Sequence, residues 1–266
     1  MNSPRQHPSR EYHRTPEVGL AIFTLRIGAI KGERPSKEEM SSIVGALVPS
    51  FSLTPCEGFF RGCPDPGWAV TVAVNDHALI ADLAESLRHH FRQDGVGIEA
   101  YGRYIRCHSN RRQGELRAEL DGIAHGFFPA YFQTAFTVLE EPSLWPVRFA
   151  IITAWATTGE EWSDKRNQDA DNRLEQALKQ RGLAHRRIIG SSPDGNHAEP
   201  GWIVEMDLAD AMHLGCEYLQ DAIYWVEGDL LSVVSCRESR SAPVGRFSER
   251  VSIKSGDFGA NKKKQI

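Results

Sequence analysis

The chain has 266 residues, of which 41% are hydrophobic and 25% charged, and its formal net charge is −4. These values are typical of a globular protein, and the slight acidic excess argues against a protein that coats nucleic acid. No apolar run approaches the roughly 20 residues of a membrane span. The N-terminal residues lack the apolar segment of a secretory signal, and the five cysteines have no regular spacing. We therefore expect a cytoplasmic protein with reduced thiols and no membrane partner.

The first half of the chain predicts alternating strands and helices. In order, the predicted elements are a strand at 18–27, a helix from the capping box at 36–39 to Pro49, a strand near Phe59, a strand at 68–74, a helix with Ile80, Leu83, Leu87 and Phe91 on its inner face, and a hairpin at 96–107 that turns at Gly102. Strands are predicted from β-branched and alternating apolar residues, and helices from apolar residues at a spacing of three or four. Either Asn75 or Asp76 is expected to cap the second helix.

The second half predicts the same series. Its elements are a strand at 149–155, a helix at 170–180 ended by Gly182, strands at 185–189 and 202–206, a helix capped by Asp207, and strands at 222–226 and 230–236 on either side of a Glu-Gly-Asp turn. A glycine just past a helix can adopt the left-handed conformation, which makes Gly182 a natural stop. Both halves therefore predict the order strand–helix–strand–strand–helix–strand.

Short motifs also recur in the same order in the two halves. The strings "DPGWAV" at 65–70 and "EPGWIV" at 199–204 form the first pair. Four further pairs are Tyr12-x-x-Thr15 with Tyr131-x-x-Thr134, Ala21–Thr24 with Ala150–Thr153, Gln93-Asp94 with Gln220-Asp221, and Arg106-Cys107 with Ser235-Cys236. Because all five share one order, we infer a tandem duplication.

The fold class predicted is α+β, with two ferredoxin-like βαββαβ units in tandem, joined by a helical linker. The expected boundaries are a disordered tail at 1–16, a first unit at 17–107, a linker helix at 108–127, a second unit at 128–236 and a disordered basic tail at 237–266. Pro, Ser, Arg and Lys dominate both ends, which is typical of segments that cannot form a core.

The second half also resembles a known bacterial family. The matching strings are "AYFQT" at 130–134, "ITAW" at 152–155, "GSSPDGNHAEPGW" at 190–202 and "YLQDAIYW" at 218–225. They resemble a domain-of-unknown-function family marked by an Ile-Thr-Ala-Trp-Asn-Pro motif, over roughly 128–236. Here Ala156-Thr157 replaces the Asn-Pro of that motif. The resemblance implies a small bacterial cytosolic α/β protein and brings no established activity.

The first candidates for a ligand site are residues kept in both halves, together with Trp155 and Glu199 of the second half. The candidate ligand-binding residues are Trp68, Gln93, Asp94, Trp155, Glu199, Trp202, Gln220 and Asp221. Each type also has a structural explanation. A tryptophan after Pro-Gly can anchor a strand against a helix, and a glutamine at a helix end can bind free carbonyl groups. Repeats share a core more often than they share chemistry, so the structural explanation is the commoner one.

An enzyme is the second hypothesis. Glu199, His197 and Asp194 lie in one loop and, with Gln220, could form a hydrolase-like or nuclease-like site. An extended strand would place His197 and Glu199 on one face. The loop is also an ordinary turn sequence, and two ligands do not make a zinc site, so we expect no metal and no cofactor.

RNA binding through the first sheet is the third hypothesis. The residues that would carry it are Arg88, Arg92, Tyr101, Arg103, Tyr104 and Arg106, which mix basic and aromatic side chains. The aromatic-rich RNA-binding signature is missing, and a solvated basic face explains the same residues. The sequence thus favours a non-enzymatic binding or regulatory protein that holds a partner protein or a small polar ligand at its sheets or between its units.

Overall fold

The structure is a computed structural model that describes residues 20–60, 62–110, 114–139, 142, 144–157 and 160–253. It is a mixed α+β protein, and its described residues form two β-sheets and five α-helices. The chain divides into two compact units, Met1–Leu120 and Asp121–Ile266, with the boundary inside helix α3 (Glu115–His125). In the described ranges, no helix is both long and apolar enough to cross a bilayer.

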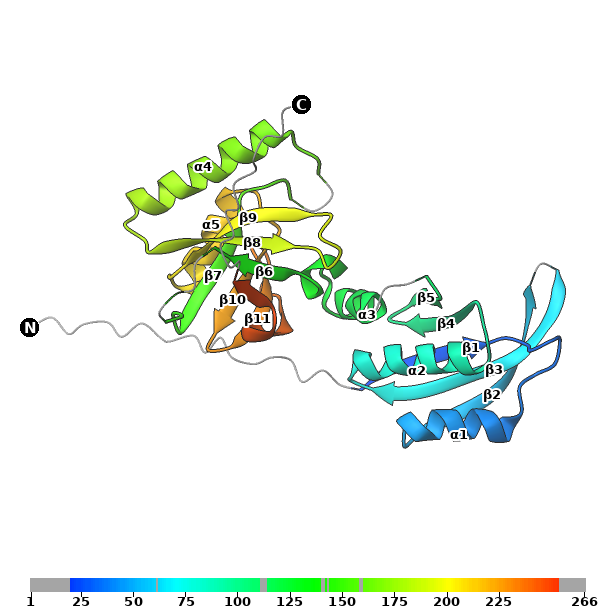
Figure 1. The fold of residues 1–266 in the computed structure, drawn as a ribbon. Coiled ribbons are helices and arrows are strands. Elements are labelled where there is room, and N and C mark those ends of the chain that lie inside the picture. Colours follow the sequence, from blue (N-terminus) through cyan, green and yellow to red (C-terminus); the bar gives the residue numbers. More distant parts are fainter. Residues whose placement is uncertain are drawn as a thin grey trace, which may run out of the picture. The chain divides into compact units, whose positions relative to one another are not determined.

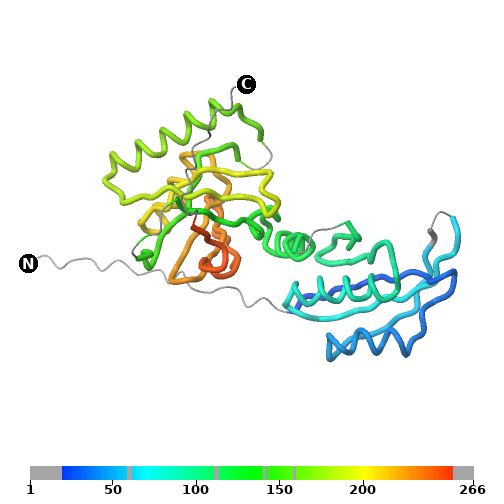
Figure 2. Tube along the Cα trace, viewed as in Figure 1, coloured from blue at the N-terminus to red at the C-terminus, as the bar shows by residue number. Residues whose placement is uncertain are grey.

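Unit 1 is one antiparallel sheet with two helices (Figure 1). Its elements are β1 (Ala21–Ile27), α1 (Lys37–Leu47), β2 (Phe51–Phe60), β3 (Cys63–Val74), α2 (His77–His90), β4 (Gly95–Ala100) and β5 (Arg103–His108). The strands lie in the order β2-β3-β1-β4-β5, and each neighbouring pair is antiparallel. The long hairpin of β2 and β3 extends past the other strands (Figure 2).

Both helices of unit 1 begin at a capping side chain. Ser36 Oγ accepts a hydrogen bond from the Glu39 amide at 3.1 Å, and Asp76 Oδ1 accepts one from the Ala78 amide at 2.8 Å. The helices pack beside each other, and His90 of α2 bonds Glu39 of α1 at 2.7 Å. They cover one face of the sheet, whose buried side chains include Phe23, Leu25, Ile27, Val70, Val72, Ile98 and Ile105.

Unit 2 is built on an eight-stranded sheet (Figure 1). Its elements are the 3-10 helix η1 (Pro129–Phe132), β6 (Ala135–Val138), β7 (Arg148–Thr153), α4 (Asp164–Gln180), β8 (His185–Ser191), β9 (Ala198–Val204), α5 (Leu208–Glu217), β10 (Ala222–Glu227), β11 (Leu230–Ser235), β12 (Ser241–Arg246), the 3-10 helix η2 (Phe247–Glu249) and β13 (Val251–Ile253). The strand order is β12-β11-β10-β7-β9-β8-β6-β13, and β13 pairs with β6 in parallel.

The two faces of the unit 2 sheet have different cores. Helices α4 and α5 cover one face, where Leu174 and Leu214 pack with Ile152 and other buried side chains of the strands. On the opposite face, which we call the second face, aromatic rings pack edge to face. Phe136 and Tyr224 lie 5.1 Å apart between ring centroids there. Burial raises the pKa of Tyr224 well above its usual range, so its hydroxyl stays a neutral donor.

The two units connect their strands in the same way. In unit 2 the strands from β7 to β11 lie in the order β8-β9-β7-β10-β11, which matches β2-β3-β1-β4-β5 of unit 1. Trp68 pairs with Ile27 of β1, and Trp202 pairs with Ile152 of β7. The glycine before each tryptophan has no room for a side chain, because a Cβ there would collide with, or lie 3.0 Å from, the carbonyl oxygen of that isoleucine. The repeated Pro-Gly-Trp string therefore brings two strands close together.

The motif pairs correspond less closely elsewhere. Because Ile27 and Ile152 face the two tryptophans, Ala150–Thr153 corresponds to residues 25–28 and not to Ala21–Thr24, so the predicted pairing is wrong by four residues. The hairpins 95–108 and 222–235 match in length, which places Cys107 two residues away from the position of Cys236. The match at Tyr12 and Thr15 lies outside the described residues.

Two predicted boundaries and one predicted capping bond need correction. Residues 241–246 and 251–253 are strands of the unit 2 sheet, although the sequence predicts a tail from 237 onward. Helix α4 begins at Asp164, capped by Ser163, and not at Ala170. Asp207 stands at the start of α5 without a side-chain capping bond.

Candidate functional site

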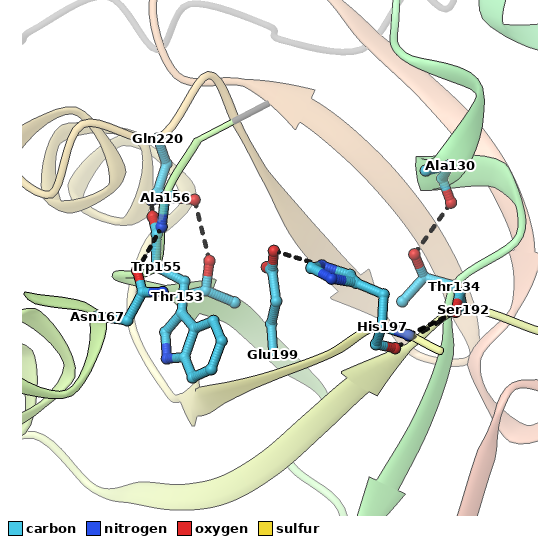
Figure 3. Close-up of polar contacts among 10 residues, drawn as sticks. All are labelled: Ala130, Thr134, Thr153, Trp155, Ala156, Asn167, Ser192, His197, Glu199 and Gln220. Carbon is cyan, nitrogen blue, oxygen red and sulfur yellow. Dashed lines mark hydrogen bonds and ion pairs between the residues drawn. The ribbon is translucent and has the colours of Figure 1, made fainter. Parts of the chain in front are cut away.

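A buried glutamine fastens the loop that follows β7 (Figure 3). The side-chain amide nitrogen of Gln220 donates to the carbonyl oxygens of Trp155 at 2.8 Å and Tyr218 at 3.1 Å. Its amide oxygen accepts from the Thr153 hydroxyl at 2.9 Å. Gln220 is 6% exposed, and every hydrogen-bonding group on its side chain has a protein partner. Gln220 therefore sets the backbone at Trp155 and is not free to contact a ligand.

Two further side chains hold the same loop. Asn167 of α4 accepts a hydrogen bond from the Ala156 amide at 3.0 Å (Figure 3). The Thr157 hydroxyl donates to Asp221 at 3.0 Å. These bonds, together with those of Gln220, hold the backbone that carries Trp155. The sequence did not single out Asn167, since a polar residue early in a helix usually faces solvent.

Glu199 lies on the second face, across from this loop. The last pair of the β7–β9 ladder is Thr153 with Gly201, and the side chain of Trp155, just past the end of β7, lies beside that of Glu199 (Figure 3). Glu199 Oε1 lies 2.8 Å from Nε2 of His197 (Figure 3). The Glu199 side chain is 28% exposed and that of His197 is 66% exposed. A partly exposed carboxylate thus lies between the indole of Trp155 and an exposed imidazole (Figure 3).

Small residues surround Glu199 on the second face. Gly190 of β8 pairs directly with Glu199, and Gly201 follows two residues later on the same strand. A Cβ at Gly190 would make ordinary contacts, at 3.4 Å with a methyl group of Thr134 and 3.7 Å with Phe136. Neither glycine adds a side chain beside the carboxylate, which leaves Glu199 accessible to a ligand.

Asp194, the third acid of the predicted hydrolase site, belongs to its own turn. It accepts hydrogen bonds from Ser192 and from the side chain of Asn196, which stabilise the loop between β8 and β9. The structure therefore joins His197 to Glu199, while Asp194 and Gln220 bind their own loops. Within the described ranges, no group of three His, Cys, Asp or Glu side chains is arranged to hold a metal ion.

Two of the candidate tryptophans, Trp68 and Trp202, are buried beneath helices. Trp68 Nε1 donates to the carbonyl oxygen of Pro35 at 2.8 Å, next to the start of α1. Trp202 Nε1 donates to Asp171 of α4 at 3.1 Å, and the guanidinium of Arg187 stacks 3.5 Å from its ring centroid. These contacts anchor each strand to a helix, which is the structural explanation given above.

Gln93 resembles Gln220 in its contacts. Its amide nitrogen donates to the carbonyl oxygens of Ala29 at 3.3 Å and Phe91 at 3.5 Å, after β1 and α2 respectively. Its neighbour Asp94 is exposed. Asp65, which stands where unit 2 has Glu199, accepts the Ala29 amide at 2.7 Å. In unit 1, Gln93 and Asp65 both bind the loop after β1.

The basic and aromatic candidates of unit 1 are divided between different surroundings. Arg88 is buried and bonds Glu85 at 2.6 and 3.0 Å, and Tyr101 bonds His77 at 2.8 Å, both on the helix-covered side. Tyr104 and Arg106 of β5 share the face of the sheet that lies opposite the two helices. Arg92 follows α2 and Arg103 begins β5.

The comparisons with known proteins place unit 2 beside a family without an assigned function. A profile of the family described as "Protein of unknown function (DUF3293)" matches residues 152–223, from the end of β7 to the start of β10. This supports the resemblance to a domain-of-unknown-function family. No curated protein matches the chain in sequence.

Two solved structures are similar to part of the chain. A phage SAM lyase in complex with S-methyl-5'-thioadenosine has 13% identity and a TM-score of 0.30, covering 36% of this chain and 94% of that chain. A phage SAM lyase in the apo state has 15% identity and a TM-score of 0.30, covering 38% and 98%. A similarity at this TM-score assigns neither an activity nor a ligand to the chain.

Proposed function

We propose that the protein is a non-enzymatic binding protein whose unit 2 holds a small polar ligand on the second face, at Glu199. The observation that carries the proposal is the partly exposed carboxylate of Glu199, which has the exposed His197 as its hydrogen-bond partner. A carboxylate has further acceptor positions beyond the one that His197 occupies, so Glu199 can accept hydrogen bonds from a ligand.

The proposal includes the origin of the two units by duplication of a ferredoxin-like unit. Their common strand order supports it, and so does the end of the second helix in each unit. Arg92 and Leu219 both have positive φ, at 51° and 61°, and each precedes the glutamine that binds the loop after the first strand. Non-glycine residues seldom adopt this conformation, so a shared pair supports common descent.

Divergence between the units supports a site in unit 2. In unit 1, Asp65 satisfies the amide of Ala29. In unit 2, Asn167 of α4 accepts from Ala156, two residues past the position that matches Ala29, and the acid that matches Asp65, Glu199, bonds His197 instead. When one unit acquires a ligand site, we expect a polar residue that stabilises the fold in the other unit to lose that role and become available for binding.

The contacts favour binding over hydrolysis. A hydrolase needs a nucleophile or bound water held by an acid–base group and a donor for the developing charge. Gln220, the donor that the enzyme hypothesis uses, is fully engaged by the loop. The RNA-binding hypothesis loses Arg88 in the same way, because its guanidinium pairs with Glu85.

Native mass spectrometry of the full-length chain tests the proposal. We expect a small-molecule adduct that co-purifies with the wild type and is lost in Glu199→Gln. Glu205→Gln is the matched control, since Glu205 is an exposed acid just past the end of the same strand. If nothing co-purifies, a thermal-shift screen of small polar compounds identifies a ligand, and its binding to the wild type and to Glu199→Gln is then compared. Binding that is equal in wild type and Glu199→Gln would refute the proposal.

A further inference from the structure

We infer that the ligand held at Glu199 presents an organic cation, a primary ammonium or guanidinium group. The inference rests on the proposed function and names the chemistry of its ligand. Three features of the second face carry it: the carboxylate, the donor that now contacts it, and the indole opposite.

The carboxylate already accepts from a donor that a ligand can replace. An ionised carboxylate only accepts hydrogen bonds, so Nε2 of His197 is the donor at 2.8 Å. The His197 side chain is 66% exposed and lies outside β9, which begins at Ala198. A ligand N–H group can therefore occupy the place of the imidazole, or bind the other carboxylate oxygen. A cationic donor makes the stronger bond, because both partners are then charged.

The indole of Trp155 favours the same class of ligand. The ring faces of tryptophan attract ammonium and guanidinium groups within about 6 Å of the ring centroid. The indole lies beside Glu199 (Figure 3), and hydrogen bonds hold the backbone at 155 and 156, so little backbone freedom is lost when a ligand binds. Asp221, which bonds Thr157 in the same loop, adds negative charge nearby. An anionic ligand would be repelled by both acids.

Gly190 indicates where the ligand lies. It pairs with Glu199 across β8 and β9, and its φ is not positive, so alanine is compatible with its backbone. The added methyl group would make ordinary contacts with Thr134 and Phe136 and would stand next to Glu199 on the second face. Gly190→Ala should therefore weaken ligand binding while leaving the melting temperature unchanged.

The test is an NMR titration of the full-length protein at constant ionic strength. The probes are butylammonium and methylguanidinium, with butanol as the neutral and butyrate as the anionic counterpart. Trp155→Phe identifies the Trp155 indole N–H signal. We expect this signal to shift saturably with at least one cation and with neither counterpart. We expect Glu199→Gln to weaken the affinity about tenfold or more, Gly190→Ala to weaken it several-fold, and Glu205→Gln to leave it unchanged.

Three outcomes would overturn the inference: an equal response to butanol or butyrate, equal cation affinity in Glu199→Gln, or no saturation by either cation up to about 50 mM, a range that covers fragment-sized ligands. In each case the mass-spectrometry experiment separates the two proposals. A co-purified ligand that still depends on Glu199 would preserve the binding function and exclude only the cation. If binding of the co-purified ligand does not depend on Glu199, both the proposed function and the cation inference are wrong.

Discussion

Replacing Gln220 with alanine should destabilise the protein far more than replacing Gln93. Both glutamines follow a residue of positive φ at the end of a helix, and both reach the loop after the first strand of their unit. They differ in the number and length of their bonds. Gln220 makes three side-chain bonds of 2.8, 2.9 and 3.1 Å, whereas Gln93 makes two of 3.3 and 3.5 Å.

The difference can be sized from these contacts. Each good hydrogen bond contributes about 1 kcal/mol net, and a buried group left unpaired costs about 1–3 kcal/mol. Gln220→Ala leaves the Thr153 hydroxyl and the Trp155 carbonyl without this partner, so we expect a loss of about 2–4 kcal/mol. Gln93→Ala should cost about 0.5–1 kcal/mol, because its bonds are long and half-exposed. For a chain of this length the larger loss lowers the melting temperature by about 5–15 °C.

Thermal melts of the two variants, with hydrogen exchange of the segment 150–157, would check this prediction. We expect the exchange of that segment to rise in Gln220→Ala and to stay at the wild-type level in Gln93→Ala. Gln220→Glu is the matched control, since it keeps the acceptor for Thr153 and loses the donor to Trp155. Equal losses in the two alanine variants would refute the reasoning.

Two further predictions concern charged groups. Asp171 is 2% exposed and accepts from both Arg187 and Trp202, so Asp171→Ala should cost about 3 kcal/mol or more, measured by urea unfolding, and Arg187→Met should recover part of the loss. The Arg88 guanidinium lowers the pKa of Glu85 to about 2. The ionised Glu85 therefore contributes fully to the free energy of unfolding above its unfolded pKa of about 4.3, and this contribution is lost as pH falls toward 2. Because Glu85 is 46% exposed, solvent screening reduces this to about 1 kcal/mol, and Glu85→Gln should flatten acid unfolding in that window; an unchanged profile would contradict it.

Local signals predicted most elements of the fold. The turn at Tyr101 and Gly102 has φ of 52° and 72°, the two-residue hairpin geometry that glycine favours, and the sequence placed the turn there. The capping box at Ser36 likewise marks the start of α1. Such features depend on neighbours in the chain, so a single sequence contains them.

Features that depend on distant partners were missed or misplaced. Strand β12 (Ser241–Arg246) contains serine, proline and glycine, and it is a strand because β11 pairs with it at the edge of the sheet. The four-residue error between β1 and β7 has a related cause. Alternating apolar residues define which face is buried but allow shifts of two or four residues, and only the pairing with Trp68 and Trp202 fixes the register.

The candidate site shows the same division. The spacing of His197 and Glu199 predicted that both side chains share one face of a strand, and the structure joins them at 2.8 Å. No signal in the sequence pointed to Asn167, whose role appears only when α4 packs over the loop after β7. Side chains that act across elements cannot be found from spacing within one element.

The exchange of loop partners explains why the duplication we propose would yield one ligand site and not two. The loop after the first strand needs an acceptor for its amide, because a buried N–H without a partner is destabilising. In unit 1 an acid of the third strand, Asp65, meets that need and cannot also bind a ligand. In unit 2 Asn167 of α4 accepts the Ala156 amide of the loop after β7, and the acid at the matching strand position, Glu199, bonds His197 on the second face. The same strand position thus stabilises one unit and is available for recognition in the other.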